Sequence, residues 1–68
     1  MVIIRAASKL LLAERISWCS RFFEACPEVH GHIQAELHRC CWENIGFGLV
    51  ALYFQNSDDH LLYLLKFP

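Results

Sequence analysis

The stretch that decides the fold is IGFGLVALYF at positions 45–54, followed by NSDDH at 56–60 and LLYLLKF at 61–67. In the first run, alternate residues would point to opposite faces of a strand, and both sets of residues are apolar. This is typical of a strand buried on both sides or covered by a partner. Positions 56–59 predict a hinge, because Asn, Ser and Asp side chains bond their own backbone. The run at 61–67 is then expected to return as a second strand, with Lys66 as a guard against edge pairing.

Two helical segments are expected before this pair of strands, after an opening strand at Val2-Ile3-Ile4. Apolar residues from position 8 to 26 recur at steps of four and three, which predicts a helix with Ser8 as its N-cap. Pro27 ends that helix. A second helix is expected from Pro27 or Glu28 to Glu43. The sequence therefore predicts an α+β fold, in the order β-α-α-β-β, forming one small domain over residues 1–68.

Composition limits the classes of function. A chain of 68 residues, 56% of them hydrophobic, buries only about 60% of its unfolded surface, so we expect self-association. Six basic and seven acidic residues are mixed along the chain, with a net charge of -1, which argues against a nucleic-acid partner. The longest uncharged apolar run covers positions 45–54, whereas a membrane helix needs about 20 residues. With no signal-peptide pattern at the N-terminus, we expect a cytoplasmic protein.

Four cysteines and four histidines invite comparison with a zinc site. Zinc ligands usually occur as two closely spaced pairs, but Cys19 and Cys26 are separated by six residues, and Cys40 and Cys41 are adjacent. On one helix, Cys19 and Cys26 would lie about 10 Å apart. We therefore expect small buried hydrophobes in a reducing cytosol, with no metal and no other cofactor. His38 and Cys41, three residues apart on a helix, would be the best pair for such a site.

No arrangement of residues indicates catalysis. The serines lack a nucleophile setting of the G-x-S-x-G kind, and the three glycines form no phosphate-binding loop. No catalytic residue is assigned, and we do not expect an enzyme.

Read in order, the motifs resemble a shortened dynein light chain of the cytoplasmic hub type. Val2-Ile3-Ile4-Arg5-Ala6 is similar to the V-I-x-x-A opening strand, and Cys19 matches a cysteine of the first helix. The stretch at 32–39, HIQAELHR, is similar to the H/Y-I-x-x-E-F-x-K pattern of the second helix. The stretch at 42–48, WENIGFG, is similar to W-x-x-I followed by a glycine and F-G. Most of the strand that members exchange between protomers is absent, and Glu43 replaces their histidine.

The resemblance implies a non-catalytic adaptor that forms a homodimer and adds a short linear peptide of its partner as an extra strand. A dynein motor complex is a further partner that it implies. Phe47 and Gly48 would begin the peptide-pairing strand, and Tyr53 would line the groove. Trp42 and Phe47 would lie at the dimer interface. The simpler interpretation is that Phe47 and Tyr53 are core aromatics, Gly48 is a strand kink and Trp42 caps the core.

Two other classes of protein remain open. Ile4-Arg5-Ala6-Ala7 is similar to the opening strand of an acyltransferase of the GCN5-related kind, of which this chain would be a truncated or degenerate N-terminal half. Such an enzyme needs a later strand-to-helix turn that binds the pyrophosphate of coenzyme A. The third class is a short open reading frame without an evolved biochemical function, which dense Cys and Trp usage would also fit.

Overall fold

The computed structural model describes residues 2–5 and 9–68. Its elements are, in chain order, β1 (Val2–Arg5), α1 (Lys9–Phe22), α2 (His32–Ala35), β2 (Cys40–Gly46), β3 (Leu49–Phe54) and α3 (Ser57–Lys66). The predicted α+β class is confirmed, but the later elements differ from the predicted order. The predicted N-cap Ser8 lies outside the described residues.

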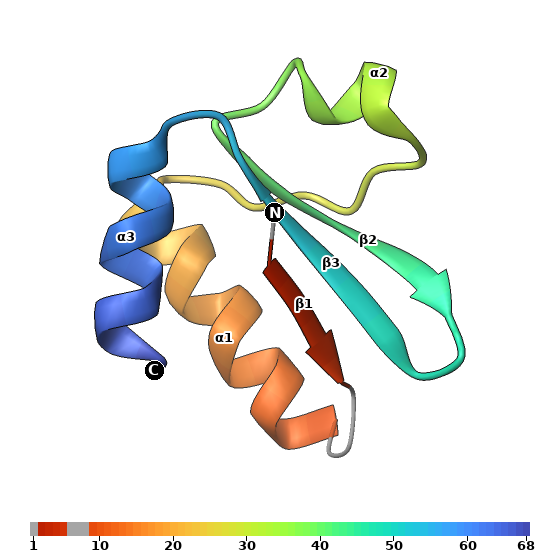
Figure 1. The fold of residues 1–68 in the computed structure, drawn as a ribbon, viewed down its shortest axis with the longest axis horizontal. Helices are drawn as coiled ribbons and strands as arrows, with labels where there is room; N and C mark the ends of the chain where they lie inside the picture. Colours follow the sequence, from red (N-terminus) through yellow and green to blue (C-terminus); the bar gives the residue numbers. More distant parts are fainter. Residues whose placement is uncertain (1, 6–8) are drawn as a thin grey trace.

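The three strands form one antiparallel sheet in the order β1-β3-β2 (Figure 1). Leu52 lies at its centre, paired with Val2 on one side and Trp42 on the other. At Trp42, the outer edge of β2 is covered by the segment before α2. The Trp42 N–H donates to the Pro27 carbonyl at 3.0 Å, and the Val29 N–H donates to the Trp42 carbonyl at 2.8 Å. β1 is therefore the other edge strand of the sheet.

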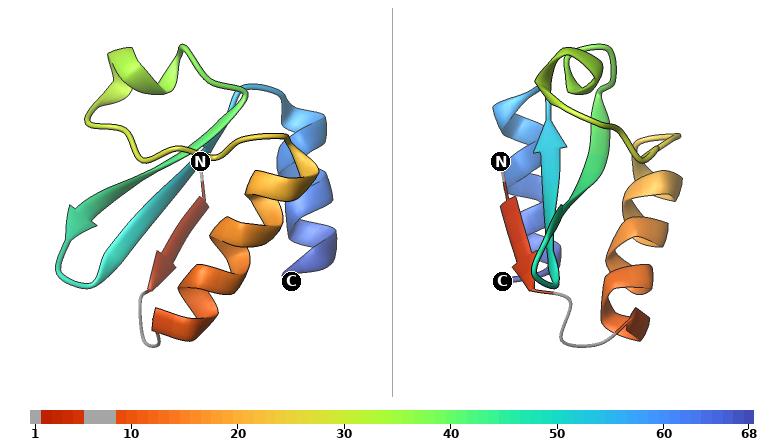
Figure 2. Two further views of the ribbon diagram at one scale, coloured as in Figure 1. Left: turned by 180° about the vertical axis from the view of Figure 1, so that it is seen from behind. Right: turned by 90° about the vertical axis from the view of Figure 1, so that its right-hand side faces the viewer.

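The core lies between the sheet and two helices. Figure 2 shows α1 on one side of the sheet, and Figure 1 shows α3 beside α1, on the side away from the β2–β3 hairpin. The Trp18 ring of α1 contacts the Tyr63 ring of α3, with centroids 6.3 Å apart. The buried core cluster has six members: Cys19, Phe23, Cys26, Cys40, Leu52 and Tyr63. Among the helices that the structure describes, none is long and apolar enough to cross a membrane.

The first helix is shorter than predicted. It ends at Phe22 rather than Cys26, because Glu24 adopts a left-handed backbone conformation with φ 73°, which ends an α-helix in the way a C-terminal glycine usually does. Pro27 then keeps Cys26 out of helical geometry, as the sequence indicated. The chain consequently turns back at the end of α1 and does not continue along the helix axis.

The prediction of a long second helix at 27–43 was wrong. Only the single turn α2 forms, after Gly31 with φ 98°, and residues from Cys40 onward form β2 instead. The residues of β2 alternate as in a strand, because Cys40 and Trp42 face the core while Cys41 and Glu43 lie on the opposite face. Pairing with β3 decides between the two conformations, since it satisfies every second backbone group of β2.

The predicted strand at 45–54 is the end of one strand, a turn and a second strand. Phe47 and Gly48 form a two-residue turn between Gly46 and Leu49, which are paired across the hairpin. Both turn residues have positive φ, 56° and 71°, as a type I′ hairpin turn requires. The sequence predicted the turn of the hairpin at 56–59, whereas the turn lies at Phe47 and Gly48.

The predicted hinge at 56–59 and strand at 61–67 were also wrong, because α3 spans most of these positions. Asn56 is the N-cap residue of α3, with extended φ and ψ. Asp58 and Asp59 in the first turn and Lys66 in the last turn complement the helix dipole. Asp59 and Tyr63 are buried, and Phe67 packs against the core, so the buried face follows a spacing of four residues that is helical.

Candidate metal centre

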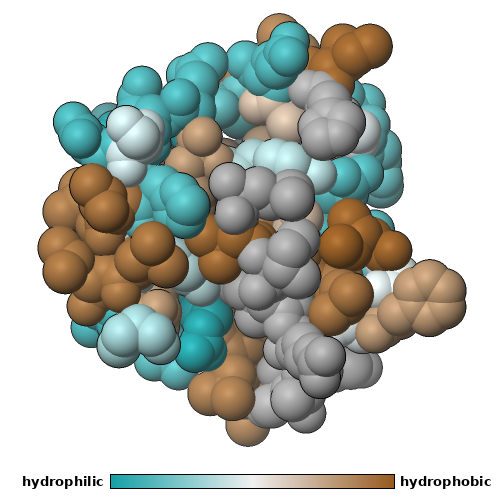
Figure 3. All heavy atoms as spheres, viewed as in Figure 1, coloured by the Kyte–Doolittle hydropathy of each residue, from teal (hydrophilic) through white to brown (hydrophobic). Residues whose placement is uncertain are grey.

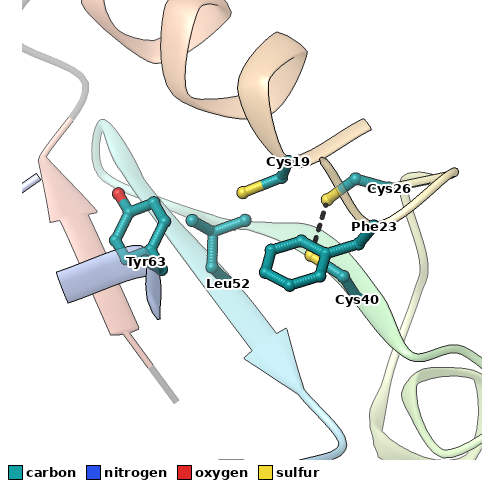
Figure 4. Packing of buried hydrophobic residues seen from close by; sticks show 6 residues of the cluster. All are labelled: Cys19, Phe23, Cys26, Cys40, Leu52 and Tyr63. Carbon is teal, nitrogen blue, oxygen red and sulfur yellow. Dashed lines mark hydrogen bonds between the residues drawn. The ribbon is translucent and has the colours of Figure 1, made fainter. Parts of the chain in front are cut away.

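Three cysteine sulfur atoms converge in the core of the protein. The Sγ atoms of Cys19, Cys26 and Cys40 all lie within 4.8 Å of one another, and those of Cys26 and Cys40 are 3.2 Å apart. Figure 4 shows that the three residues come from α1, from the segment after it and from β2. Segments that are separate in the sequence therefore meet at sulfur, the softest ligand atom that proteins offer a metal ion.

The local backbone explains this convergence. Cys19 lies on the last full turn of α1, where the Phe23 N–H donates to its carbonyl at 2.9 Å. The left-handed Glu24 reverses the chain, so Cys26 returns beside Cys19 instead of lying two turns further along a helix. Cys40 is the first residue of β2 and pairs with Phe54. The expectation that the spacing of these cysteines prevents their convergence was therefore wrong.

The spacing of the sulfur atoms suits a single bound ion. Three sulfurs held about 2.3 Å from one metal ion are about 4 Å apart when the three lie in a plane with it. The distances of 3.2 Å and up to 4.8 Å bracket that value. A movement of less than about 1 Å per side chain would bring each sulfur to bonding distance, which lies within ordinary rotamer adjustment. All three thiols are free.

Hydrogen bonds among the three thiols shift their pKa values in different directions. Hydrogen bonds from Cys26 and Cys40 lower the pKa of the Cys19 thiol to about 4. The pKa of Cys26 is raised to about 12, first by its hydrogen bond to Cys19 and then by desolvation, and that of Cys40 is raised chiefly by its hydrogen bonds to the other two. Cys19 is thus the favoured thiolate, and full ionisation of the cluster needs a cation in its midst.

The site is closed to solvent. Cys19 and Cys40 are fully buried and Cys26 is 6% exposed. Phe23, Leu52 and Tyr63 complete the cluster around them. Arg39 covers the Phe23 ring, with its guanidinium carbon 5.1 Å from the ring centroid. A closed site of this kind suits an ion that ties segments together, because a catalytic ion keeps one position open for substrate.

The fourth cysteine and the expected His38–Cys41 pair are not part of this centre. Cys41 follows Cys40 on β2, so its side chain lies on the opposite face of the sheet, where its Sγ contacts the Ala35 carbonyl oxygen at 3.8 Å. His38 lies between α2 and β2 rather than on a helix. The helical spacing on which the pairing depended is therefore absent.

The residues expected to bind a peptide or a second protomer are dispersed. Phe47 and Gly48 form the hairpin turn rather than the start of a strand, and the Phe47 side chain is fully exposed. It is therefore not a core aromatic. Trp42 is half-buried and packs against the core cluster, so in this structure it fills the fold's own interior.

Tyr53 lies on β3, on the face of the sheet opposite α1. Its hydroxyl donates to Glu43 Oε1 at 2.9 Å, and the Gly31 N–H donates to Glu43 Oε2 at 2.8 Å. The hydrogen bond to Glu43 raises the pKa of Tyr53. Tyr53 also lines a shallow pocket of about 280 Å³, together with Ala35, Glu36, Phe54 and Gln55.

Comparisons with protein-family models, with curated proteins and with solved structures found no match for this chain. The resemblance to dynein light chains therefore stays a prediction, and the function must be argued from the site itself.

From the sequence alone, the three converging cysteines are interpreted as small buried hydrophobes, and their convergence is not predicted. One signal was present: a residue before proline is biased away from helix, so Cys26 could not continue the face of Cys19. The adjacent pair Cys40-Cys41 gave a second signal, because on a strand one of two neighbouring residues always faces the core. The position of Cys40 beside Cys19 depends on long-range strand pairing, which no local pattern encodes.

Proposed function

We propose that this protein is a non-catalytic metal-binding domain that holds one thiophilic metal ion between Cys19, Cys26 and Cys40. The convergence of three buried sulfur atoms from α1, the segment after it and β2 carries the proposal. Each thiol that coordinates the ion gives up its proton, so binding replaces S–H hydrogen bonds by metal–sulfur bonds.

The physical role of the ion would be to stabilise the fold. A domain of 68 residues has a small core and gains much from a cross-link. Cys19 and Cys26 are seven positions apart in the sequence, and Cys26 and Cys40 are fourteen positions apart. The ion would therefore close two loops at once, which is how structural zinc sites support small domains.

The test is a titration of the reduced protein with Zn(II) or with Cd(II), in the absence of oxygen. We expect one ion per chain, release of protons and the ultraviolet charge-transfer absorption of metal–thiolate bonds. Cys26→Ser is expected to weaken binding by at least about tenfold, since even indirect changes near a metal often cost that much. Cys41→Ser is the matched control and should bind as the wild type does, because its sulfur lies on the other face of the sheet.

The absence of saturable binding to the folded, reduced wild type would refute the proposed function. Equal loss of binding in Cys26→Ser and Cys41→Ser would place the ion elsewhere. Circular dichroism of each variant without metal separates a lost ligand from a lost fold.

A second candidate function is protein association. Figure 3 shows an apolar patch where Figure 1 shows α3. Four leucines of this helix are exposed: Leu61 (58%), Leu62 (40%), Leu64 (41%) and Leu65 (80%). Exposed apolar surface on this scale is typical of interfaces. The homodimer that the sequence predicted would find its driving force here, since Trp42 packs against its own core.

This second candidate has a direct test. Leu65→Lys is expected to shift the sedimentation coefficient toward that of a monomer at micromolar concentration, because a charge in an apolar interface is costly to bury. Ser17→Lys, on an exposed position of α1, is the control for added charge. A wild type that sediments as a monomer throughout would contradict self-association.

The peptide adaptor expected from the resemblance stays a prediction. Strand addition requires an edge with unpaired backbone groups, and the expected one, beginning at Phe47, is a turn. The edge strand β1 is the alternative, because β3 is its neighbour on one side only.

A further inference from the structure

We infer that the ion held by Cys19, Cys26 and Cys40 is monovalent copper, bound by three sulfur atoms without a fourth ligand. The inference rests on the proposed metal-binding function and names the ion that this site fits. It follows from the number of ligands, from the buried, apolar surroundings of the site and from the preferences of the metal ions themselves.

The protein supplies three ligand side chains to this site, which limits the choice of metal ion. Among the side chains that the structure describes, those grouped closely enough to hold one ion are these three cysteines. Cys41 is directed to the opposite face of the sheet, where it contacts Ala35. A tetrahedral ion would therefore lack a protein ligand at its fourth position.

Water is a poor substitute for the missing ligand. The ligand side chains are 0%, 6% and 0% exposed, and the neighbouring Phe23 and Leu52 are 3% and 0% exposed. A buried water needs two to four polar partners, whereas these neighbours supply apolar carbon. Tyr63 is the one member of the core cluster with a hydroxyl, and Figure 4 shows it on the far side of Leu52 from Cys26 and Cys40.

The coordination preferences of Zn(II) and Cu(I) differ, and this difference selects one of the two ions for a site with three sulfur ligands. Structural Zn(II) is almost always four-coordinate. Monovalent copper is a soft ion that thiolates select, and it is stable with two or three sulfur ligands. Charge favours the divalent ion, because three thiolates around Zn(II) leave one negative charge and around Cu(I) leave two. Zn(II) is therefore the direct competitor, and the test compares the two ions.

The experiment is X-ray absorption spectroscopy of the reduced, oxygen-free wild type loaded separately with Cu(I) and with Zn(II). For copper we expect one ion per chain and a single shell of three sulfur atoms. For zinc, whose preferred fourth position the site leaves unfilled, we expect complete displacement by one equivalent of Cu(I). Cys19→Ser should reduce the copper shell to two sulfur atoms, and Cys41→Ser should leave three.

The remaining outcomes distinguish failure of the copper inference from failure of the metal-binding function. A copper cluster with several ions per chain, or zinc that Cu(I) fails to displace, would overturn the copper inference and leave the metal-binding function intact. Failure of both ions to bind would overturn both proposals. If Cys19→Ser does not fold, the sulfur count of the wild type and of Cys41→Ser still decides the question.

Discussion

At the scale of single residues, the ion pair between Arg39 and Asp59 joins the end of the 36–39 segment to α3. Asp59 is the one charged residue among the buried residues that the structure describes. Arg39 donates two hydrogen bonds to it, from Nε to Oδ2 at 2.8 Å and from an Nη atom to Oδ1 at 3.1 Å. The hydrogen bond from Arg39 lowers the pKa of Asp59, so its carboxylate stabilises the folded state.

This pKa shift predicts the pH dependence of stability. The contribution of Asp59 is fully present above the pKa of an unfolded aspartate, about 3.9, and is lost as the pH falls through the lower pKa of the folded state. Asp59→Asn should therefore lower the urea midpoint near neutral pH and flatten its decline below about pH 4. The measurement is a series of urea melts from acid to neutral pH.

Asp58→Asn is the matched control for this prediction, because Asp58 occupies the same first turn of α3 but is exposed. It tests the effect of the helix dipole alone. Identical pH profiles for the two variants would mean that the pair with Arg39 adds nothing.

At the scale of elements, the hairpin turn carries local strain. Phe47 has φ 56° and its ring is fully exposed, so the strain is not offset by packing. A left-handed conformation costs a side-chain-bearing residue about 1–2 kcal/mol, whereas Asn tolerates it and Asn-Gly is a preferred type I′ turn. Phe47→Asn is expected to raise the free energy of unfolding by about 1 kcal/mol.

Urea melts of Phe47→Asn and Phe47→Ala check this prediction. The alanine variant removes the ring but keeps a side chain that disfavours positive φ, so its stability should stay close to that of the wild type. Stabilisation of both variants by the same amount would attribute the gain to loss of the ring rather than to the turn. Sedimentation of Phe47→Asn also tests the predicted place of Phe47 in a dimer interface.

Element types were predictable where several signals agreed. The apolar spacing at 9–22 was sufficient to predict the helix α1, and the strand character of residues 49–54 was sufficient to predict β3. The run LLYLLKF is apolar at spacings of two and of four, so its periodicity fits a strand and a helix equally. The capping residue Asn56 and the acidic first turn favour the helix, but the same residues also favour a turn.

The ends of elements were less predictable than their types. The end of α1 depends on Glu24, a residue that rarely adopts positive φ, and β2 depends on pairing with β3. The candidate metal centre depends on both features. It could not be assembled from the sequence for that reason, although all three cysteines were considered as ligands.

At the scale of the whole molecule, metal binding predicts a change in stability. A ligand that binds only the folded state stabilises it by about 2.7 kcal/mol when its free concentration is 100 times its dissociation constant. Thermal melts of the reduced protein should therefore shift upward with added metal. The shift should be retained in Cys41→Ser and reduced in Cys26→Ser.

A chelator should reverse this stabilisation in the wild type. Equal melting temperatures with and without metal, at concentrations that saturate binding, would mean that the ion does not hold the three segments together. The metal would then be a bound cargo rather than a structural cross-link.

The backbone of residues 27–29 that covers β2 has a practical consequence for experiments with this protein. With the outer edge of β2 occupied at Trp42, another chain would extend the sheet most readily alongside β1, close to the amino terminus. An affinity tag fused at that end would stand in the way of such an incoming strand, whereas one placed after Pro68 would leave the approach open. Binding assays that depend on sheet extension are therefore best carried out with carboxy-terminal tags.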